Sequence, residues 1–438
     1  MSIEKSLAFQ DRARRIIPGW TQLLSKRPDQ FSAGVWPGYF KKASGVHVWD
    51  LDGNQYVDMS ISGIGANVLG YADAGVNAAV IEAIGMGSSS SLNCYEEVEL
   101  AEKLCELHPW AEQVRFARTG GESMTVAVRI ARAFTGRSKI AFCGYHGWHD
   151  WYLAANLSTS EALNDHLIKG LEPVGVPKEL AGTAIPFRFN DCEALEKIVT
   201  LYGDELAAIV LEPIRNDGPT EEFKAMIASV RERTGAVVII DEISAGFRIA
   251  PGGAHLVLGY DPDIAVFSKA LGNGFPIGAV IGKERVMSAA ARSFISSTCW
   301  TERVGVVAAL ATLDTYCTKR VHEHLIAIGT QVQAGWKAAS EATGLKISVS
   351  GIAPLSHFGF LYDNPLEMKA YFVQLMMASG FLASNLFYSM YAHKSFHVEA
   401  YSAAVTQAFA EIKRAHEAGE LRSLLRGKPA NSGFLRLN

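Results

Sequence analysis

The pattern of hydrophobic and polar positions changes along the chain and divides it into regions. Between about residues 110 and 282, short and continuous apolar runs alternate with amphipathic segments of helix length. Such runs, often β-branched, are typical of strands buried on both faces of a mostly parallel sheet. The pattern predicts strands at Val114–Ala117, Lys139–Cys143, Ala207–Leu211, Val237–Ile240 and Ile264–Phe267.

The two ends of the chain follow other patterns. Alternating polarity around Asp52 and Gly53 predicts a two-stranded hairpin. Helices are predicted over residues 3–16, 74–85, 95–107, 302–342 and 398–417. We expect a large domain over residues 61–320, a small α+β domain over 321–438, and an N-terminal segment, 1–60, that packs with the small domain.

Composition and charge exclude several classes of protein. The 438 residues are 49% hydrophobic and 20% charged, which is ordinary for a globular protein. A net charge of −4 gives no bulk attraction for nucleic acid or for an anionic membrane. No apolar run approaches the ~18 residues that a membrane span needs. With no apolar leader and six sparse cysteines, we expect a cytoplasmic protein with reduced thiols that binds neither nucleic acid nor membrane.

Residue types that bind or react follow each predicted strand. Ligands of open α/β sheets bind beyond the carboxyl ends of the strands, so these residues are expected to meet at one edge. The residues concerned are Thr119, Gly120 and Gly121 after the first strand, then Tyr145 and His146, Glu212, Asp241 and Lys269 after the others. Five such coincidences predict a site.

Each residue type has a chemical use beside an ordinary structural one. Residues 119–121 open a helix, and bare amides at the positive end of a helix dipole bind anions, most naturally phosphate, although a simple helix cap has the same sequence. Asp241 ends an apolar strand and needs a cationic partner there, unless it caps a helix. Lys269 also ends a buried run, where a lysine becomes a usable amine nucleophile, whereas most single lysines are surface residues.

Together these groups suit pyridoxal 5′-phosphate (PLP). Its phosphate would lie at the helix N-terminus, its ring would stack on Tyr145, its pyridinium would pair with Asp241, and its aldehyde would form a Schiff base with Lys269. No metal is predicted, because no further ligand completes the pair His146 and His149.

The motifs and their order resemble the class III (subgroup II) aminotransferases of fold type I, most closely the glutamate-1-semialdehyde 2,1-aminomutase group. The resemblance covers roughly residues 10–320 and rests on VRFARTGGESMTVAVR, GYHGWHD, VVIIDEISAGFR and SKALGNGFPIG. It implies an α/β fold with a mostly parallel, seven-stranded sheet covered by helices on both faces, and a smaller α+β domain built from both chain ends. It also implies PLP and a homodimer with active sites at the subunit interface.

The resemblance assigns roles to individual residues. Lys269, Asp241 and Tyr145 would be catalytic, and Ile243 would pack on the ring face opposite Tyr145. The other cofactor contacts would be Thr119, Gly120, Gly121, His146, Glu212, Asn216 and, from the neighbouring subunit, Thr298. The family motif has a hydroxyl residue where this chain has Gly121, so that residue cannot provide one of the phosphate bonds.

The segments that would bind substrate differ from those of the aminomutase. The segment SAGVWPGYFKK lacks the arginine that holds the substrate carboxylate, and LASNLFYSMYAH lacks the substrate-loop glutamate. Losing a carboxylate clamp removes on the order of 2–3 kcal/mol of recognition. Lys26, Arg27, Trp36 and Trp148 are candidate substrate residues, and the two cations suit an anionic or sugar-derived aldehyde or ketone, although a solvated basic turn reads the same.

These differences favour a transaminase. It would use a ping-pong mechanism through a Lys269 aldimine, with a small-molecule amino donor and a carbonyl acceptor. The alternative is the aminomutase itself, which exchanges amine and carbonyl within one carbon skeleton. A non-catalytic binding protein on the same fold is a third hypothesis, disfavoured because Lys269, Asp241 and Tyr145 are all present.

Overall fold

The computed structural model describes residues 2–166, 168–214 and 216–431. The chain forms two compact units, one from residues 1–73 together with 323–438, and the other from Ala74–His322. The domain limits predicted from the sequence lie near residues 60 and 320. The same prediction places the two chain ends together in one domain.

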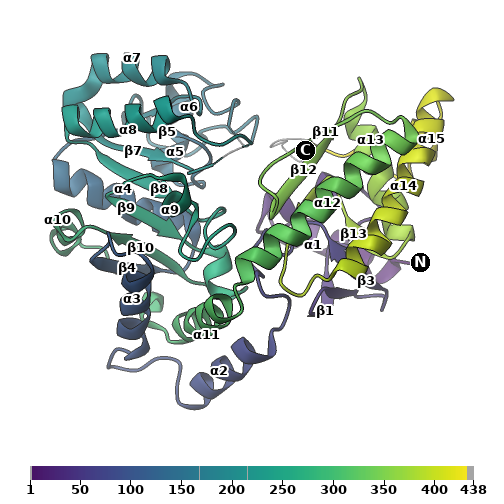
Figure 1. Ribbon diagram of the computed structural model, residues 1–438, viewed down its shortest axis with the longest axis horizontal. Helices are drawn as coiled ribbons and strands as arrows, with labels where there is room; N and C mark the ends of the chain where they lie inside the picture. Colours follow the sequence, from purple (N-terminus) through teal and green to yellow (C-terminus); the bar gives the residue numbers. More distant parts are fainter. Residues whose placement is uncertain (1, 167, 215, 432–438) are drawn as a thin grey trace. The chain divides into compact units, whose positions relative to one another are not determined.

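Within the described residues, the unit Ala74–His322 has one seven-stranded sheet in the order β4-β10-β9-β8-β7-β5-β6 (Figure 1). Neighbours from β9 to β6 run parallel, and β10 runs antiparallel to both β4 and β9. The mostly parallel central sheet is therefore confirmed. The strands are β4 (Gln113–Ala117), β5 (Lys139–Cys143), β6 (Ala184–Pro186), β7 (Leu206–Leu211), β8 (Val237–Asp241), β9 (Ile264–Phe267) and β10 (Gly278–Gly282).

Strands β6 and β10 were missed because neither has a clear strand pattern. β6 has only three residues, and β10 reads GAVIG with a glycine at each end. Close packing demands both glycines: a Cβ on Gly278 would lie 2.1 Å from Ser123 Oγ, and one on Gly282 would lie 2.6 Å from the carbonyl oxygen of Asp263.

The inner strands of this sheet are largely apolar because alternate residues enter two different cores. On β5, Ile140 and Phe142 pack in the core that α4 (Gly120–Thr135) covers, whereas Ala141 and Cys143 pack in the core on the other face. That second core is completed by α7 (Cys192–Tyr202) and α8 (Glu221–Thr234). Each buried residue of this size contributes about 1.5–3 kcal/mol, so the two-sided burial holds the strand ends rigidly.

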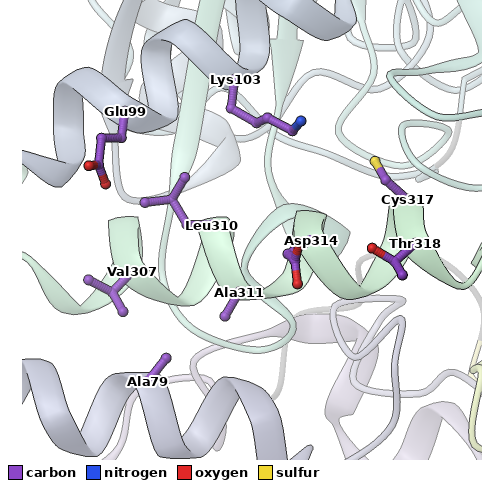
Figure 2. Close-up of a pocket in the computed structure, with 9 residues that line it drawn as sticks. All are labelled: Ala79, Glu99, Lys103, Val307, Leu310, Ala311, Asp314, Cys317 and Thr318. Carbon is purple, nitrogen blue, oxygen red and sulfur yellow. The ribbon is translucent and has the colours of Figure 1, made fainter.

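Three further helices of this unit pack together: α2 (Ala74–Gly85), α3 (Glu96–Leu107) and α11 (Val304–Thr318). A cavity of about 570 Å³ is lined by residues of these helices. Glu99, Lys103 and Asp314 are among the lining residues that Figure 2 labels. No residue that follows a parallel strand lines it, so this cavity is separate from the predicted site. The shorter helices are α5 (Asp150–Leu153), α6 (Ala155–Ser158), α9 (Ala254–Leu258) and α10 (Glu284–Met287).

The other unit is built from both chain ends. β1 (Phe40–Ser44), β2 (His47–Asp50), β3 (Gln55–Met59) and β13 (Phe381–Ala383) form one sheet, and β11 (Ile347–Ser350), β12 (Leu355–Phe360) and β14 (Leu386–Tyr388) form another. β2 and β3 are the predicted hairpin, and β13 pairs in parallel with β3. The remaining helices are α1 (Glu4–Ile16), α12 (Val321–Thr343), α13 (Pro365–Ala378), α14 (Ser395–Glu417) and α15 (Leu421–Leu424). Among the described residues, no helix combines the length and apolarity that crossing a membrane requires.

Candidate active site

The residues predicted to meet do lie at the carboxyl ends of the strands. Asp241 is the last residue of β8 and is only 4% exposed. Glu212 follows β7 directly, and Tyr145 and His146 follow β5. Lys269 begins the 3₁₀ turn η5 (Lys269–Gly272) just after β9. Each of these residues therefore takes its position from the end of a buried strand.

Asp241 is buried with a histidine as its partner. One carboxylate oxygen, Oδ2, lies 2.7 Å from Nδ1 of His146, and Oδ1 accepts a 3.0 Å hydrogen bond from the Ile243 amide. The second ring nitrogen of His146, Nε2, lies 3.1 Å from the carbonyl oxygen of Cys143, which only accepts hydrogen bonds. His146 therefore directs Nε2 to the backbone carbonyl and Nδ1 to the carboxylate of Asp241. This partner stabilises a carboxylate in a site where burial alone would be unfavourable.

Lys269 has the properties of an amine nucleophile. Burial lowers the pKa of Lys269, the carboxylates of Asp241 and Glu212 oppose this effect, and Arg248 adds to it. Its Nζ donates a 2.6 Å hydrogen bond to Ser244 Oγ. The backbone φ of +42° is in the left-handed region, which a lysine rarely adopts and which is common at functional sites. A lowered pKa increases the fraction of neutral, nucleophilic amine at neutral pH.

The start of α4 has an arrangement suited to an anion. Thr119 is the N-cap: its side chain accepts a hydrogen bond from the Glu122 amide at 3.4 Å, and Glu122 Oε2 accepts one from the Thr119 amide at 3.0 Å. This capping box uses the amides of Thr119 and Glu122. The amides of Gly120 and Gly121 are then the first-turn donors available to a ligand.

Replacing Thr119 with alanine is expected to lower the free energy of unfolding by about 1 kcal/mol, because the N-cap hydrogen bond is lost. Urea denaturation of the two proteins measures this difference. Thr119→Ser is the matched control, since it keeps the hydroxyl. Equal stability of the alanine and serine variants would mean that the cap contributes nothing.

Several further predicted residues surround the same space. Ile243 packs against the helix start, since a Cβ on Gly120 would lie 3.0 Å from its Cδ1. The Tyr145 amide donates a 3.1 Å hydrogen bond to Glu212 Oε2. Burial raises the pKa of the Tyr145 hydroxyl, and nearby Asp241 raises it further. These contacts bring Gly120, Tyr145, Glu212 and Ile243 into one neighbourhood with Asp241.

Three other predicted residues are largely exposed in the structure. Asn216 and Thr298 are both exposed, the first in a bend after β7 and the second in the turn η7 (Thr298–Thr301). Trp148 is 69% exposed. Their predicted roles stay predictions.

Three candidate substrate residues belong to the other unit. Lys26 is exposed in the turn η1 (Leu24–Lys26). Arg27 is buried, and its Nε donates a 2.6 Å hydrogen bond to Asp29, so its guanidinium already has a carboxylate partner. Trp36 stacks on Phe31 with ring centroids 4.0 Å apart. Lys26 is the more accessible cation of the two for an anionic substrate.

Sequence reasoning missed two residues that the structure places at the site. Ser244 contacts Lys269, and the available signal was a hydroxyl in the DEIS motif that begins at Asp241. His149 packs on Gly121, with its Cδ2 atom 3.0 Å from the position of a Cβ there. The sequence holds no signal for this second contact, because it depends on the path of the loop after β5.

Comparison with known proteins identifies the family. A family model described as aminotransferase class-III matches residues 32–360, well over half of the chain. The chain belongs to the class III aminotransferases. This aminotransferase is 30% identical over 427 residues to the 3-aminobutyryl-CoA aminotransferase of Cloacimonas acidaminovorans, a match covering 94% of this chain and 99% of the relative. It is 32% identical over 377 residues to a glutamate-1-semialdehyde 2,1-aminomutase of Polynucleobacter necessarius, covering 84% and 86% respectively.

Solved structures agree on the fold and the cofactor of the aminotransferase. The PLP internal aldimine form of the Sphingopyxis sp. MTA144 FumI protein matches with a TM-score of 0.85 and 25% identity over 97% of this chain and 98% of that one. A transaminase with PLP bound matches with a TM-score of 0.84 and 26% identity over 95% and 100%. The predicted family, fold type and PLP cofactor are confirmed.

The residues at the strand ends fit this cofactor. Asp241 is a buried carboxylate suited to a ring nitrogen cation, Gly120 and Gly121 offer amides to a phosphate, and Lys269 has a lowered pKa. When bound, PLP supplies an electrophilic carbon and an electron-withdrawing ring.

Proposed function

We propose that this aminotransferase transfers an amino group between two separate small molecules in a ping-pong reaction. Lys269 would act as nucleophile and as proton carrier, with Ser244 orienting its amine. Asp241, held by His146, would pair with the ring nitrogen of the cofactor. Gly120 and Gly121 would bind the phosphate, and Tyr145 and Ile243 would bound the ring on opposite faces.

One observation favours intermolecular transfer over the aminomutase reaction. The segment SAGVWPGYFKK, which corresponds to the arginine-bearing segment of the aminomutase, contains no arginine, and its Trp36 stacks on Phe31. An aromatic pair cannot give a carboxylate the paired, charge-assisted hydrogen bonds of arginine. The relative named for 3-aminobutyryl-CoA further supports a donor whose amine lies away from the carboxyl carbon.

A nitrogen-transfer experiment tests this proposal. The enzyme is given ¹⁵N-labelled 3-aminobutyrate and unlabelled pyruvate, and mass spectrometry follows the label. We expect ¹⁵N-alanine to accumulate with the wild-type protein and not with Lys269→Ala. Efficient conversion of glutamate 1-semialdehyde without any second carbonyl compound would overturn intermolecular transfer in favour of the aminomutase.

We expect Lys26→Ala to raise the KM for an anionic acceptor a few-fold, with kcat almost unchanged. The reason is that an exposed ion pair contributes only about 0.2–1 kcal/mol. Steady-state kinetics with 2-ketoglutarate and with an uncharged aldehyde measure the effect, and Lys26→Arg should restore the wild-type KM. An equal rise in KM for the uncharged aldehyde would contradict a charge-based role.

We also propose a homodimer in the cytoplasm, with Thr298 reaching the cofactor phosphate of the partner subunit. The exposure of Thr298 supports this assembly, as do exposed apolar side chains on α2 and α3, among them Ile81, Ile84 and Val98. Light scattering coupled to size exclusion gives the oligomeric state.

The cysteines support the cytoplasm as the compartment. All six lie in the described part of the chain and none forms a disulfide, which suits a reducing compartment.

A further inference from the structure

We propose that His149 is a phosphate ligand of the cofactor and takes the place of the side chain that residue 121 lacks. The inference rests on the proposed function, in which Gly120 and Gly121 bind the phosphate through their amides. It adds a side-chain donor to that site and explains why the second residue of α4 is a glycine.

The geometry places the imidazole where a side chain of residue 121 would be. A Cβ built on Gly121 would lie 3.0 Å from Cδ2 of His149 and 3.1 Å from its Nε2. Trp148 Nε1 lies 3.7 Å from the same point. These are tight contacts, so the edge of the ring that carries Nε2 fills the space that a side chain at position 121 would occupy.

The loop after β5 runs close over this space. A Cβ on Gly147 would lie 3.2 Å from the Cα of Gly121, so the loop passes directly over the helix start. Gly147 has φ +102°, a conformation that favours glycine, and this bend directs the chain onto α4. His149 follows the bend and precedes the short helix α5. The path of the backbone therefore brings residue 149 to the start of α4.

The ring nitrogens of His149 are available for a ligand. Among the described residues they make no hydrogen bond, and the ring is partly buried, 4.5 Å from the Trp148 ring between centroids. Burial lowers the pKa of His149, while the carboxylates of Glu122 and Asp150 act in the opposite direction. Whether neutral or charged, an imidazole can donate an N–H to a phosphate oxygen. A partly buried donor without a partner beside two free amides suits a phosphate.

The test separates phosphate binding from packing. The full chain is equilibrated by dialysis with pyridoxamine 5′-phosphate, which forms no bond to Lys269, and separately with pyridoxamine. His149→Phe keeps an aromatic ring at this position and removes the donor, so we expect the dissociation constant for pyridoxamine 5′-phosphate to rise about ten- to one-hundredfold, as for a lost charge-assisted hydrogen bond. The dissociation constant for pyridoxamine should not change.

A second pair of variants tests the exchange of roles directly. Gly121→Ser alone should weaken binding of pyridoxamine 5′-phosphate, because its Cβ meets the His149 ring. In a His149→Ala background the same substitution should tighten binding, because the hydroxyl then has room and takes over as donor. Gly121→Ser is thus expected to weaken binding when His149 is present and to strengthen it when His149 is replaced by alanine. This reversal is expected if the two side chains compete for one place beside the phosphate.

The outcomes are distinguishable. If His149→Phe binds pyridoxamine 5′-phosphate as tightly as wild type, His149 only fills space and the inference is overturned while the proposed function stands. Equal loss of both compounds would also overturn it, because the ring and not the phosphate would then be affected. If the wild-type chain binds pyridoxamine 5′-phosphate no better than pyridoxamine, the proposed phosphate site itself is wrong.

Discussion

We expect Lys269→Ala to abolish amino transfer while the protein keeps its fold. The variant loses the amine nucleophile and the group that moves the proton, and positioned proton transfer alone is worth about 10²–10⁴-fold in rate. The total loss is expected to exceed that range, because no neighbouring side chain replaces the nucleophile. Rapid-mixing measurements of the half-reaction with the amine donor give the rate.

Two controls make the result for Lys269 specific. Binding of pyridoxamine 5′-phosphate should survive in Lys269→Ala, since the phosphate and ring contacts come from other residues. Ser244→Ala, which removes only the hydrogen bond to Nζ, should slow the half-reaction far less. Near wild-type turnover in Lys269→Ala would show that Lys269 is neither the nucleophile nor the proton carrier.

The lowered pKa of Lys269 also has a consequence for stability. A lysine whose folded pKa lies below its unfolded value destabilises the fold at pH values below the folded pKa, and this cost disappears as the pH rises through the unfolded pKa. Lys269→Met should therefore raise the unfolding temperature of the cofactor-free protein at neutral pH, and the gain should shrink toward pH 11. A gain that does not change with pH would point to packing instead.

Asp241→Asn should cause the second-largest loss, on the order of 10²–10³-fold in kcat. The substitution keeps the shape and the hydrogen bond to the Ile243 amide but removes the anion that stabilises positive charge on the cofactor ring, and preorganised electrostatic groups have effects of this size. Half-reaction rates measure the loss. The absorbance of the bound cofactor, followed against pH, reports the change at the ring nitrogen independently of turnover.

His146→Asn is the companion to Asp241→Asn. It leaves the carboxylate in place and removes only its 2.7 Å partner, so the loss should be smaller than for Asp241→Asn. The double variant should be no worse than Asp241→Asn alone, because both changes act through one carboxylate. Fully additive losses would show that His146 acts on something other than Asp241.

Much of the fold followed from local patterns. The runs Lys139–Cys143 and Ile264–Phe267 are β5 and β9 with the same bounds, because strands buried on both faces form nearly continuous apolar runs. The predicted helix over 302–342 is in fact two helices, α11 and α12, separated by a short turn with Arg320 at φ +47°. Only Lys319 and Arg320 separate the two helices, and neither is a glycine or proline, so the sequence gives no stop signal between them.

The sequence predicts the positions of those site residues that lie at the ends of strands. Asp241 and Lys269 each follow a buried strand, and parallel strands bring their carboxyl ends to one edge whatever the loops do. Arg27 shows the opposite case: its sequence suggests a substrate cation, and its ion pair with Asp29 appears only in three dimensions. The partner of a side chain in a turn depends on the path of the backbone, which the sequence pattern does not show.

The sequence alone therefore determined the family, the PLP cofactor, the parallel sheet and the residues at the strand ends, because these depend on patterns repeated within single segments. The tertiary structure decided the pairing of His146 with Asp241, the contact of Ser244 with Lys269, and the placement of His149 on Gly121. Each of these joins segments far apart in the chain or bent by a loop, and their distances of about 3 Å depend on how two buried backbones are packed together.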